Sequence, residues 1–99
     1  MNTYIIRPYF GHDCNSVDGF NDGRYLDEIE VLADSEYDAI EQCIAKQKES
    51  LPKETEIFDF FGDFDTVAWI TDYSDEADEE GNREYLYKYI DFGDVRLKD

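Results

Sequence analysis

The chain has 99 residues and a formal net charge of -17 at pH 7, because 26 aspartates and glutamates outnumber 9 lysines and arginines. This length corresponds to one domain, residues 1–99, with a single small core. So acidic a surface argues against direct binding to nucleic acid or to anionic lipid, since both are negatively charged. With 41% hydrophobic and 16% aromatic residues, the chain is too rich in rings for a disordered acidic tail.

The sequence contains no segment that predicts membrane insertion or export. No apolar run approaches the roughly 20 residues that span a bilayer, and the first ten residues lack the basic and apolar regions of a signal peptide. We therefore expect a cytoplasmic protein, in the cytoplasm of the host cell if a phage encodes it. The two cysteines, Cys14 and Cys43, are too few for a disulfide scaffold, and Cys43 is expected to be a buried apolar residue.

The N-terminal third predicts two strands separated by a loop. Residues 3–10 are rich in β-branched and aromatic side chains, and Pro8 predicts that this strand lies at an edge or ends nearby. Residues 11–23 contain two Asp-Gly turn dipeptides and are expected to form a long loop. Residues 24–33 alternate between acidic and apolar side chains, which is typical of a half-buried antiparallel strand.

Residues 34–50 predict the one clear helix. Asp34 or Ser35 can cap its N-terminus, acidic side chains occupy its first turn, and lysines lie near its end, as the helix dipole favours. Pro52 ends it. Its apolar face is expected to consist of residues spaced three to four apart: Tyr37, Ile40, Cys43, Ile44 and Leu51.

The C-terminal half predicts a β-hairpin. Residues 56–64 are ambiguous between a short strand broken at Gly62 and a turn of helix. Residues 66–73 and 83–92 read as two strands joined by an acidic turn at 75–82, and residues 94–99 as a short tail. Together the elements predict an α+β fold, a small antiparallel sheet of about four strands with the helix packed on one face.

Carboxylates crowd around the turn of the predicted hairpin. Residues i and i+2 of a strand lie on one face about 6.6 Å apart, comparable to the step between phosphates along a nucleic-acid strand. Carboxylates so spaced can bind the lysine and arginine side chains that normally hold phosphate. The alternative is a solvated loop that keeps the protein soluble. The candidate contact residues are Asp72, Asp75, Glu76, Asp78, Glu79 and Glu80, with Asp63 and Asp65 before them and Glu84 after them.

Three tyrosines of the last predicted strand are further candidates for partner contacts. Tyr85, Tyr87 and Tyr89 alternate and therefore share one face. If the opposite face is the core, these rings point outward and offer contact area and hydroxyl groups to a partner. The alternative is that the faces are reversed, or that both are covered and the tyrosines fill a second core layer.

The sequence contains no catalytic or cofactor motif. His12 and Cys14 form an H-x-C pair without the further ligands of a zinc site or the third group of a nucleophilic site. The acidic stretches 13–22 and 72–81 do not match the register of a calcium-binding EF-hand loop. We therefore expect a protein that is not an enzyme, with no cofactor and no dedicated metal site.

In its size, its charge and the acidic run from Asp72 to Glu80, the chain resembles the small acidic inhibitors of phage origin, which include anti-CRISPR and anti-restriction proteins and DNA mimics. The resemblance implies a protein that blocks the nucleic-acid-binding surface of a CRISPR effector or restriction enzyme. An immunity protein or antitoxin for a nuclease toxin fits the same features, since it too would be steered toward a basic cleft. The remaining alternatives are a non-catalytic acidic subunit and an enzyme or metal-dependent module.

Overall fold

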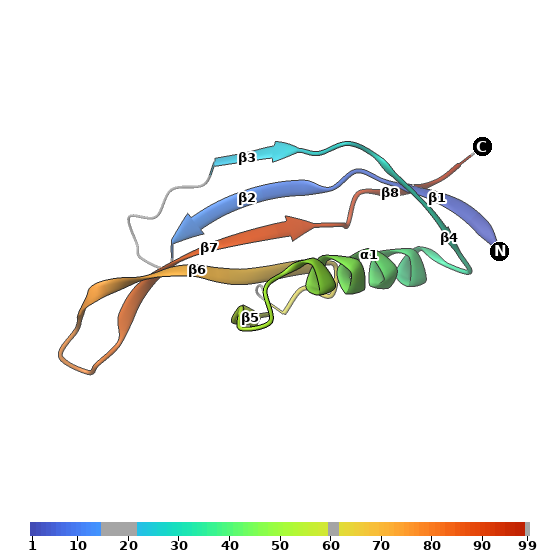
Figure 1. Cartoon of the computed structure of the whole chain (residues 1–99). Helices are drawn as coiled ribbons and strands as arrows, with labels where there is room; N and C mark the ends of the chain where they lie inside the picture. Colours follow the sequence, from blue (N-terminus) through green and yellow to red (C-terminus); the bar gives the residue numbers. More distant parts are fainter. Residues whose placement is uncertain (15–21, 60–61, 99) are drawn as a thin grey trace.

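The computed structural model describes residues 1–14, 22–59 and 62–98 (Figure 1). Within these residues the strands form two antiparallel sheets, one with the order β4-β1-β8 and one with the order β3-β2-β7-β6-β5. The predicted α+β fold with one helix is confirmed, and the sheets contain more strands than the four expected. The elements are β1 Asn2–Ile6, β2 Tyr9–Cys14, β3 Asp22–Tyr25, β4 Ile29–Ala33, α1 Glu36–Ser50, β5 Ile57–Phe58, β6 Thr66–Ala77, β7 Arg83–Asp91 and β8 Val95–Leu97.

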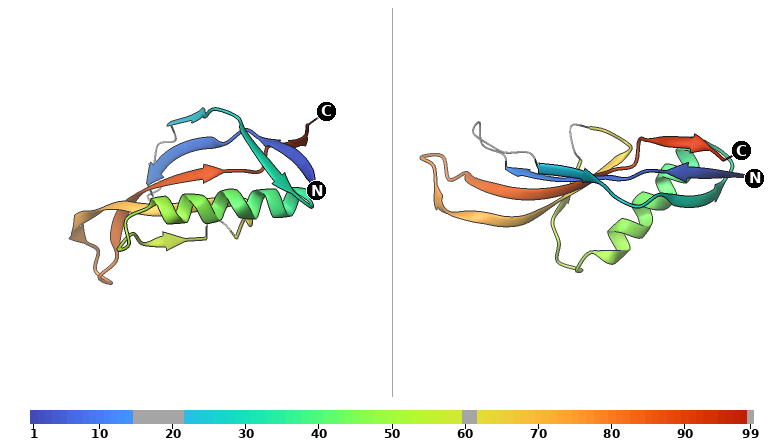
Figure 2. Two further views of the ribbon diagram at one scale, coloured as in Figure 1. Left: turned by 45° about the vertical axis from the view of Figure 1, so that its right-hand side comes forward. Right: turned by 90° about the horizontal axis from the view of Figure 1, so that it is seen from above.

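The two sheets are joined by chain segments that run from one into the other. The Arg7 N–H donates to the Asp94 carbonyl at 2.9 Å, and the Leu26 N–H donates to the Pro8 carbonyl at 2.8 Å. Only two residues, Arg7 and Pro8, connect β1 to β2. The segments on either side of them each have three residues at this point: 26–28 between β3 and β4, and 92–94 between β7 and β8. An extra residue in a strand bends it, so the sheet bends where Pro8 interrupts the ladder. The resulting body is long, with extents of 54 × 25 × 20 Å (Figure 2).

Pro8 lies at the centre of the structure and not at an edge. The strand that precedes it ends at Ile6, as predicted. Of the two alternatives, the edge strand is excluded, because β1 lies between β4 and β8, and β2 lies between β3 and β7. The missing N–H is tolerated because Pro8 falls in the gap between the two ladders, where it is fully buried.

The helix has Ser35, one of the two predicted residues, as its N-cap, and Leu51 as its C-cap. The Asp38 N–H donates to Ser35 Oγ at 3.1 Å, and the Leu51 N–H closes the last turn on the Lys48 carbonyl. Ile40 and Cys43 are buried as predicted, with Ala39 beside them. Tyr37 is not part of the apolar face: it is 54% exposed and its ring stacks on Phe64.

The main core lies between α1 and the sheet face that it covers, at the end of the molecule that carries both termini (Figure 2). The largest side chains of this core come from both sheets and the helix: Tyr4, Ile6, Val31, Ile40, Val67, Trp69, Ile90 and Phe92. Val31 is buried as the alternation predicted, whereas Ile29 is 37% exposed because β4 is an edge strand. In the described part of the chain, no helix has the length and apolar character needed to cross a bilayer.

A second buried cluster lies on the opposite face of the five-stranded sheet. It contains Ala68, Tyr87 and Tyr89, with Tyr9, Phe58 and Tyr85 packed against it. The tyrosines therefore fill a second core layer, one of the alternatives that the sequence left open. Two glycines make room for the rings, because a Cβ on Gly11 would lie 2.5 Å from the Tyr89 ring and a Cβ on Gly23 would collide with Tyr9.

Several strand boundaries differ from the prediction. The predicted loop 11–23 is partly strand, since β2 extends to Cys14 and β3 begins at Asp22, while residues 15–21 lie outside the described residues. The stretch 24–33 is divided between β3 and β4. Strand β6 continues to Ala77, and the predicted tail contains β8, which pairs with β1. In the ambiguous region only β5 forms, and Gly62 has a positive φ of 73°.

The fit between Gly11 and Tyr89 generates a prediction for stability. Gly11→Ala is expected to lower the free energy of unfolding by about 1–3 kcal/mol, the usual cost of overpacking a filled site. Urea-induced unfolding followed by circular dichroism measures this change. In a Tyr89→Leu background the same substitution is expected to cost less, because the ring that meets the new Cβ is gone. Equal costs in the two backgrounds would contradict the proposed contact.

Candidate functional site: an acidic hairpin and a tyrosine face

Strands β6 and β7 form a hairpin that extends past the rest of the molecule (Figure 1, orange). Its turn is ordered by Asp78, whose Oδ1 accepts the N–H groups of Glu80 at 2.9 Å and Asn82 at 2.8 Å. The Gly81 N–H donates to the Asp78 carbonyl, and Gly81 has a φ of 86°, which glycine adopts without strain. The Asp78 carboxylate therefore shapes the turn and is less available to a partner than its neighbours are.

The hairpin brings together most of the carboxylates that the sequence singled out. We call residues 72–84 the acidic hairpin. Asp75 and Glu76 lie on β6 and not in the turn where they were expected. All seven predicted carboxylates in this segment are exposed: Asp72, Asp75, Glu76, Asp78, Glu79, Glu80 and Glu84. The other two predicted carboxylates, Asp63 and Asp65, lie at the base of the hairpin and are not part of this group.

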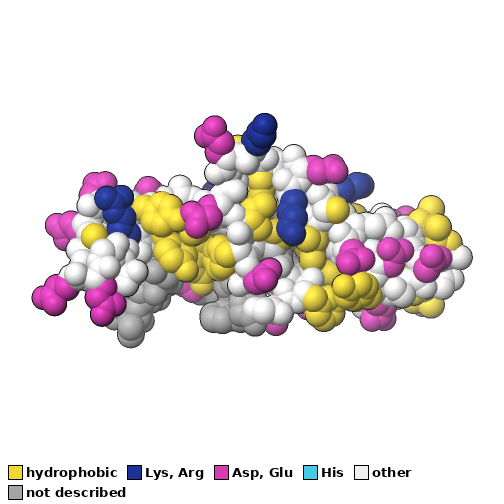
Figure 3. Space-filling view, turned by 90° about the horizontal axis from the view of Figure 1, so that it is seen from below, with side chains coloured by type: hydrophobic (Ala, Val, Ile, Leu, Met, Phe, Trp, Pro, Cys, Tyr) yellow, Lys and Arg dark blue, Asp and Glu magenta, His cyan; other side chains and the backbone are white. Residues whose placement is uncertain are grey.

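Positive charge does not neutralise the acidic hairpin. Residues 62–94 contain 11 acidic and 2 basic side chains. Arg96 pairs with Glu28 at 2.6 Å and Lys98 pairs with Glu30 at 2.7 Å, both beside the three-stranded sheet. The charge is therefore partly paired near the termini and unpaired at the hairpin. Seen from below, acidic side chains surround the hairpin end and hydrophobic side chains gather beside them (Figure 3).

A second group of carboxylates lies where the two sheets meet. Asp91 Oδ1 accepts the Gly93 N–H at 2.7 Å, and Asp65 Oδ1 accepts the Thr66 hydroxyl at 3.2 Å. Burial raises the pKa of Asp91 above its ordinary value, the negative charges of Asp65, Asp63 and Asp94 raise it further, and the Gly93 N–H opposes them. Within the described residues, no three His, Cys, Asp or Glu side chains are placed to hold a metal ion.

The tyrosines form a continuous row on the sheet face opposite the helix, which we call the tyrosine face: Tyr25, Tyr9, Tyr89, Tyr87, Tyr85 and Tyr73. Successive ring centroids lie between 5.1 Å, for Tyr9 with Tyr25, and 6.4 Å, for Tyr9 with Tyr89. Of the three tyrosines named from the sequence, Tyr87 and Tyr89 are only 8% and 6% exposed, and Tyr85 is half-buried. These two buried rings offer a partner little surface.

The exposed rings of this row, Tyr25 and Tyr73, were not identified as candidates from the sequence. Tyr25 is 52% exposed and Tyr73 is 42% exposed. Tyr73 shares the face of Tyr85 because the β6–β7 register shifts between Ile70 and Asp72, which reverses the alternation along β6. A strand pattern in the sequence does not reveal such a bulge. The Tyr73 hydroxyl donates to the Glu56 carboxylate, and this hydrogen bond raises the pKa of Tyr73.

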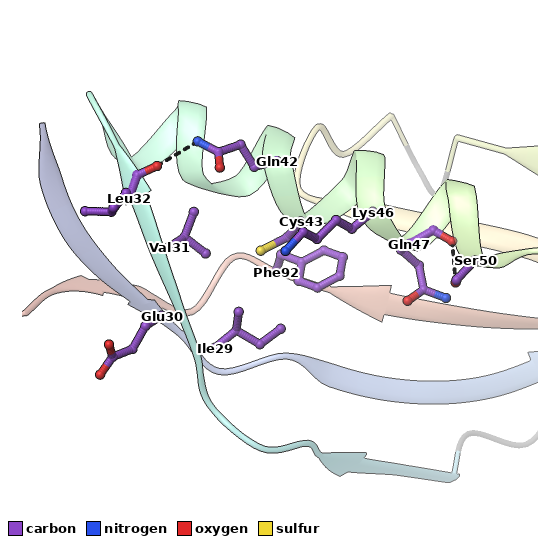
Figure 4. A pocket seen from close by; sticks show the side chains of 10 residues that line it. All are labelled: Ile29, Glu30, Val31, Leu32, Gln42, Cys43, Lys46, Gln47, Ser50 and Phe92. Carbon is purple, nitrogen blue, oxygen red and sulfur yellow. Dashed lines mark hydrogen bonds between the residues drawn. The ribbon is translucent and has the colours of Figure 1, made fainter.

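A separate groove of about 380 Å³ lies between α1 and the edge strand β4 (Figure 4). Its walls include Val31, Cys43 and Phe92, and Gln42 Nε2 donates to the Leu32 carbonyl across it. Burial raises the pKa of the Cys43 thiol, which keeps it protonated and unreactive. His12 lies on β2 opposite Lys88, on the other sheet, so the groove contains no nucleophile paired with a histidine.

Comparison of the chain with protein-family models, with curated proteins and with solved structures found no match.

The raised pKa of Asp91 predicts a pH-dependent contribution to stability. The folded state holds the Asp91 proton more readily than the unfolded state, so this group lowers stability as the pH rises through its folded pKa. Asp91→Asn, which keeps an oxygen for the Gly93 N–H, is therefore expected to raise the Tm by a few degrees at pH 7. The gain is expected to vanish below the ordinary aspartate pKa of 3.8, where both states are protonated.

Thermal unfolding across this pH range measures the effect, and Asp75→Asn is the matched control. Asp75 lies on the exposed part of the hairpin, so its replacement is expected to change the Tm less at pH 7. A gain for Asp91→Asn that persists undiminished in acid would contradict the proposed origin of the effect.

Proposed function

We propose that this chain is an inhibitor that binds the basic nucleic-acid-binding surface of a nuclease, CRISPR effector or restriction enzyme and excludes nucleic acid from it. The observation that supports this proposal most directly is the acidic hairpin, where exposed carboxylates project without ion-pair partners among the described residues. Such an arrangement costs stability through self-repulsion. A partner that supplies lysine and arginine side chains removes that repulsion and gains charge-assisted hydrogen bonds.

The overall charge density supports the same proposal. A net charge of -17 over a length of 54 Å corresponds to one negative charge per 3.2 Å. One strand of a DNA duplex carries one charge per about 3.4 Å of helix axis. A surface built to attract a phosphate backbone would therefore also attract this molecule, and association would be fast and sensitive to salt.

A rigid hairpin suits this role better than a flexible acidic tail. Strand pairing holds the hairpin carboxylates in place before binding, so less conformational entropy is lost on association. The function proposed here requires no catalysis by this chain. Its specificity comes from the positions of the charges and from the exposed rings beside them.

Two triple variants test the role of the hairpin. Glu76→Gln, Glu79→Gln and Glu80→Gln remove three hairpin charges and spare Asp78, which shapes the turn. Glu41→Gln, Glu49→Gln and Glu54→Gln make the same chemical change on and just after α1. The hairpin variant is expected to bind the partner about tenfold more weakly at low salt, as the loss of three modest ion pairs predicts. The helix variant is expected to change binding much less.

The measurement is affinity capture from a bacterial lysate with the natural chain and both variants, followed by binding assays with the purified partner. The proposal predicts a partner that binds nucleic acid itself, that duplex DNA or RNA releases, and that the hairpin variant retains poorly. Retention of a partner that binds no nucleic acid, or equal retention by the natural chain and the hairpin variant, would refute the proposal.

A further inference from the structure

The outer edge of β4 runs along the groove beside α1. Within the described residues, β4 pairs with β1 on one side only and ends its sheet on the other. An edge strand presents a row of backbone N–H and C=O groups to which a further strand can pair. The hydrogen bonds of the neighbouring strand β1 show which groups of β4 these are.

The pairing register determines which backbone groups of β4 point outward. The Thr3 carbonyl accepts the Lys98 N–H at 2.9 Å, so the backbone groups of Thr3 point toward β8 and away from β4. Leu32 lies opposite Thr3 in the β1–β4 ladder. The two residues therefore form a non-hydrogen-bonded pair, and the N–H and C=O groups of Leu32 point to the outer edge. Those of Glu30, two residues earlier on the same strand, point the same way.

Side chains of α1 cover one half of this edge and leave the other half open. Gln42 Nε2 donates to the Leu32 carbonyl at 2.9 Å. Just beyond it, the Asp34 N–H donates to Asp38 Oδ2 at 3.2 Å. Among the described residues, the Leu32 N–H and the backbone groups of Glu30 have no such partner. The open half of the edge therefore offers both donors and an acceptor to an extended backbone.

The groove beside the open half of the edge suits apolar side chains. Its volume is about 380 Å³, and the side chains of Ile29 and Val31 extend into it from β4 (Figure 4). The side chains of Glu30 and Leu32 lie on the opposite face of the strand (Figure 4). A strand added to β4 would alternate in the same way, so every second side chain would enter the groove. There it would contact Ile29, which is 37% exposed.

Charge decides which side chains the added strand carries on its other face. Lys46 lines the groove, so a second cation is disfavoured inside it. On the opposite face of β4, Glu30 keeps 59% of its side chain exposed although it pairs with Lys98. The whole chain has a net charge of -17, which attracts a basic segment and repels an acidic one, a second copy of this chain included.

We propose that the outer edge of β4 binds an extended segment of a partner protein, with apolar side chains in the groove and basic side chains on the opposite face. The segment adds one strand to the three-stranded sheet. Backbone hydrogen bonds supply affinity, and the groove selects the alternate side chains. This edge lies near the termini, at the other end of the molecule from the acidic hairpin (Figure 1), and the inference does not depend on the proposed function.

The test compares two labelled peptides of equal composition and charge, one that alternates valine with lysine and one that places all its valines before its lysines. Fluorescence anisotropy at one fixed salt concentration measures their Kd values. The natural chain is expected to prefer the alternating peptide, because only this peptide separates apolar and basic side chains onto two faces of a strand. Leu32→Pro is expected to bind it about threefold to tenfold more weakly, since the variant loses one backbone hydrogen bond.

Leu32→Ala provides the matched control, because it removes the same side chain and keeps the outward N–H. It is expected to change the Kd much less than Leu32→Pro does. Proline is expected to fit at this position, since the N–H that it lacks takes no part in the β1–β4 ladder. Circular dichroism verifies that both variants are folded.

Two methylated peptides provide a test that leaves the protein unchanged. An added strand turns the N–H groups of only every second residue toward β4. Methylation of the backbone nitrogens of all valines, or of all lysines, in the alternating peptide therefore blocks opposite edges of the strand. One of these two peptides is expected to lose binding and the other to retain it.

The inference would be overturned if the natural chain bound the alternating and the block peptides equally, or if folded Leu32→Pro and Leu32→Ala bound the alternating peptide equally. If Leu32→Pro does not fold, the methylated peptides make the decision, and equal effects of the two methylations would contradict binding at the edge. Analytical ultracentrifugation tests the other occupant. A natural chain that is dimeric, and that Leu32→Pro makes monomeric, would show that a second copy covers this edge and would also overturn the inference.

Discussion

Among the described residues, the single helix α1 can cover only one of the two faces that the sheet must bury. Helix α1 covers only the face at the end with the termini, and there it completes the main core with side chains such as Ile6, Val67 and Ile90. In the part of the chain that the structure describes, no helix covers the opposite face of the five-stranded sheet. It is buried by its own tyrosines, which lie across neighbouring strands where Gly11 and Gly23 leave space. An antiparallel sheet can leave one face toward solvent, and here large aromatic rings cover part of that face.

This arrangement explains where the charge is placed. A core on one face and a ring cluster on the other use most of the apolar side chains of the central strands, so the carboxylates are displaced to the hairpin, the sheet junction and the outer face of the helix. Near the termini Arg96 and Lys98 pair with Glu28 and Glu30. At the hairpin the described residues include no such pairs, and repulsion is limited instead by exposure to water and by screening. The fold therefore tolerates a large net charge because most of it is held away from the buried clusters.

Local signals in the sequence predicted local structure well. The Ser35 cap, the apolar spacing around Ile40 and Cys43, and Pro52 defined the helix, because these features act within a few residues of one another. The hairpin was also predictable from two strand-like runs flanking a turn. The position of β8 was not, since Val95–Leu97 is a strand only because β1 offers a partner almost the whole chain away. Sequence-based prediction of the candidate site had the same limit. The acidic residues could be identified from the sequence, but the exposure of Tyr73 and Tyr25 depends on a bulge and on cross-strand register.

The tyrosines of this face fall into two groups: buried rings, which pack the sheet face, and exposed rings, which a partner can reach. The inner rings, Tyr87 and Tyr89, are less than 10% exposed. They hold the outer rings in place through a series of contacts between neighbouring rings. The outer rings, Tyr25 and Tyr73, are 52% and 42% exposed. Rings held rigidly lose little entropy when a cation stacks on them, and carboxylates held on paired strands lose little when a guanidinium approaches. A basic partner would therefore meet a surface whose charges and rings are already positioned before it binds.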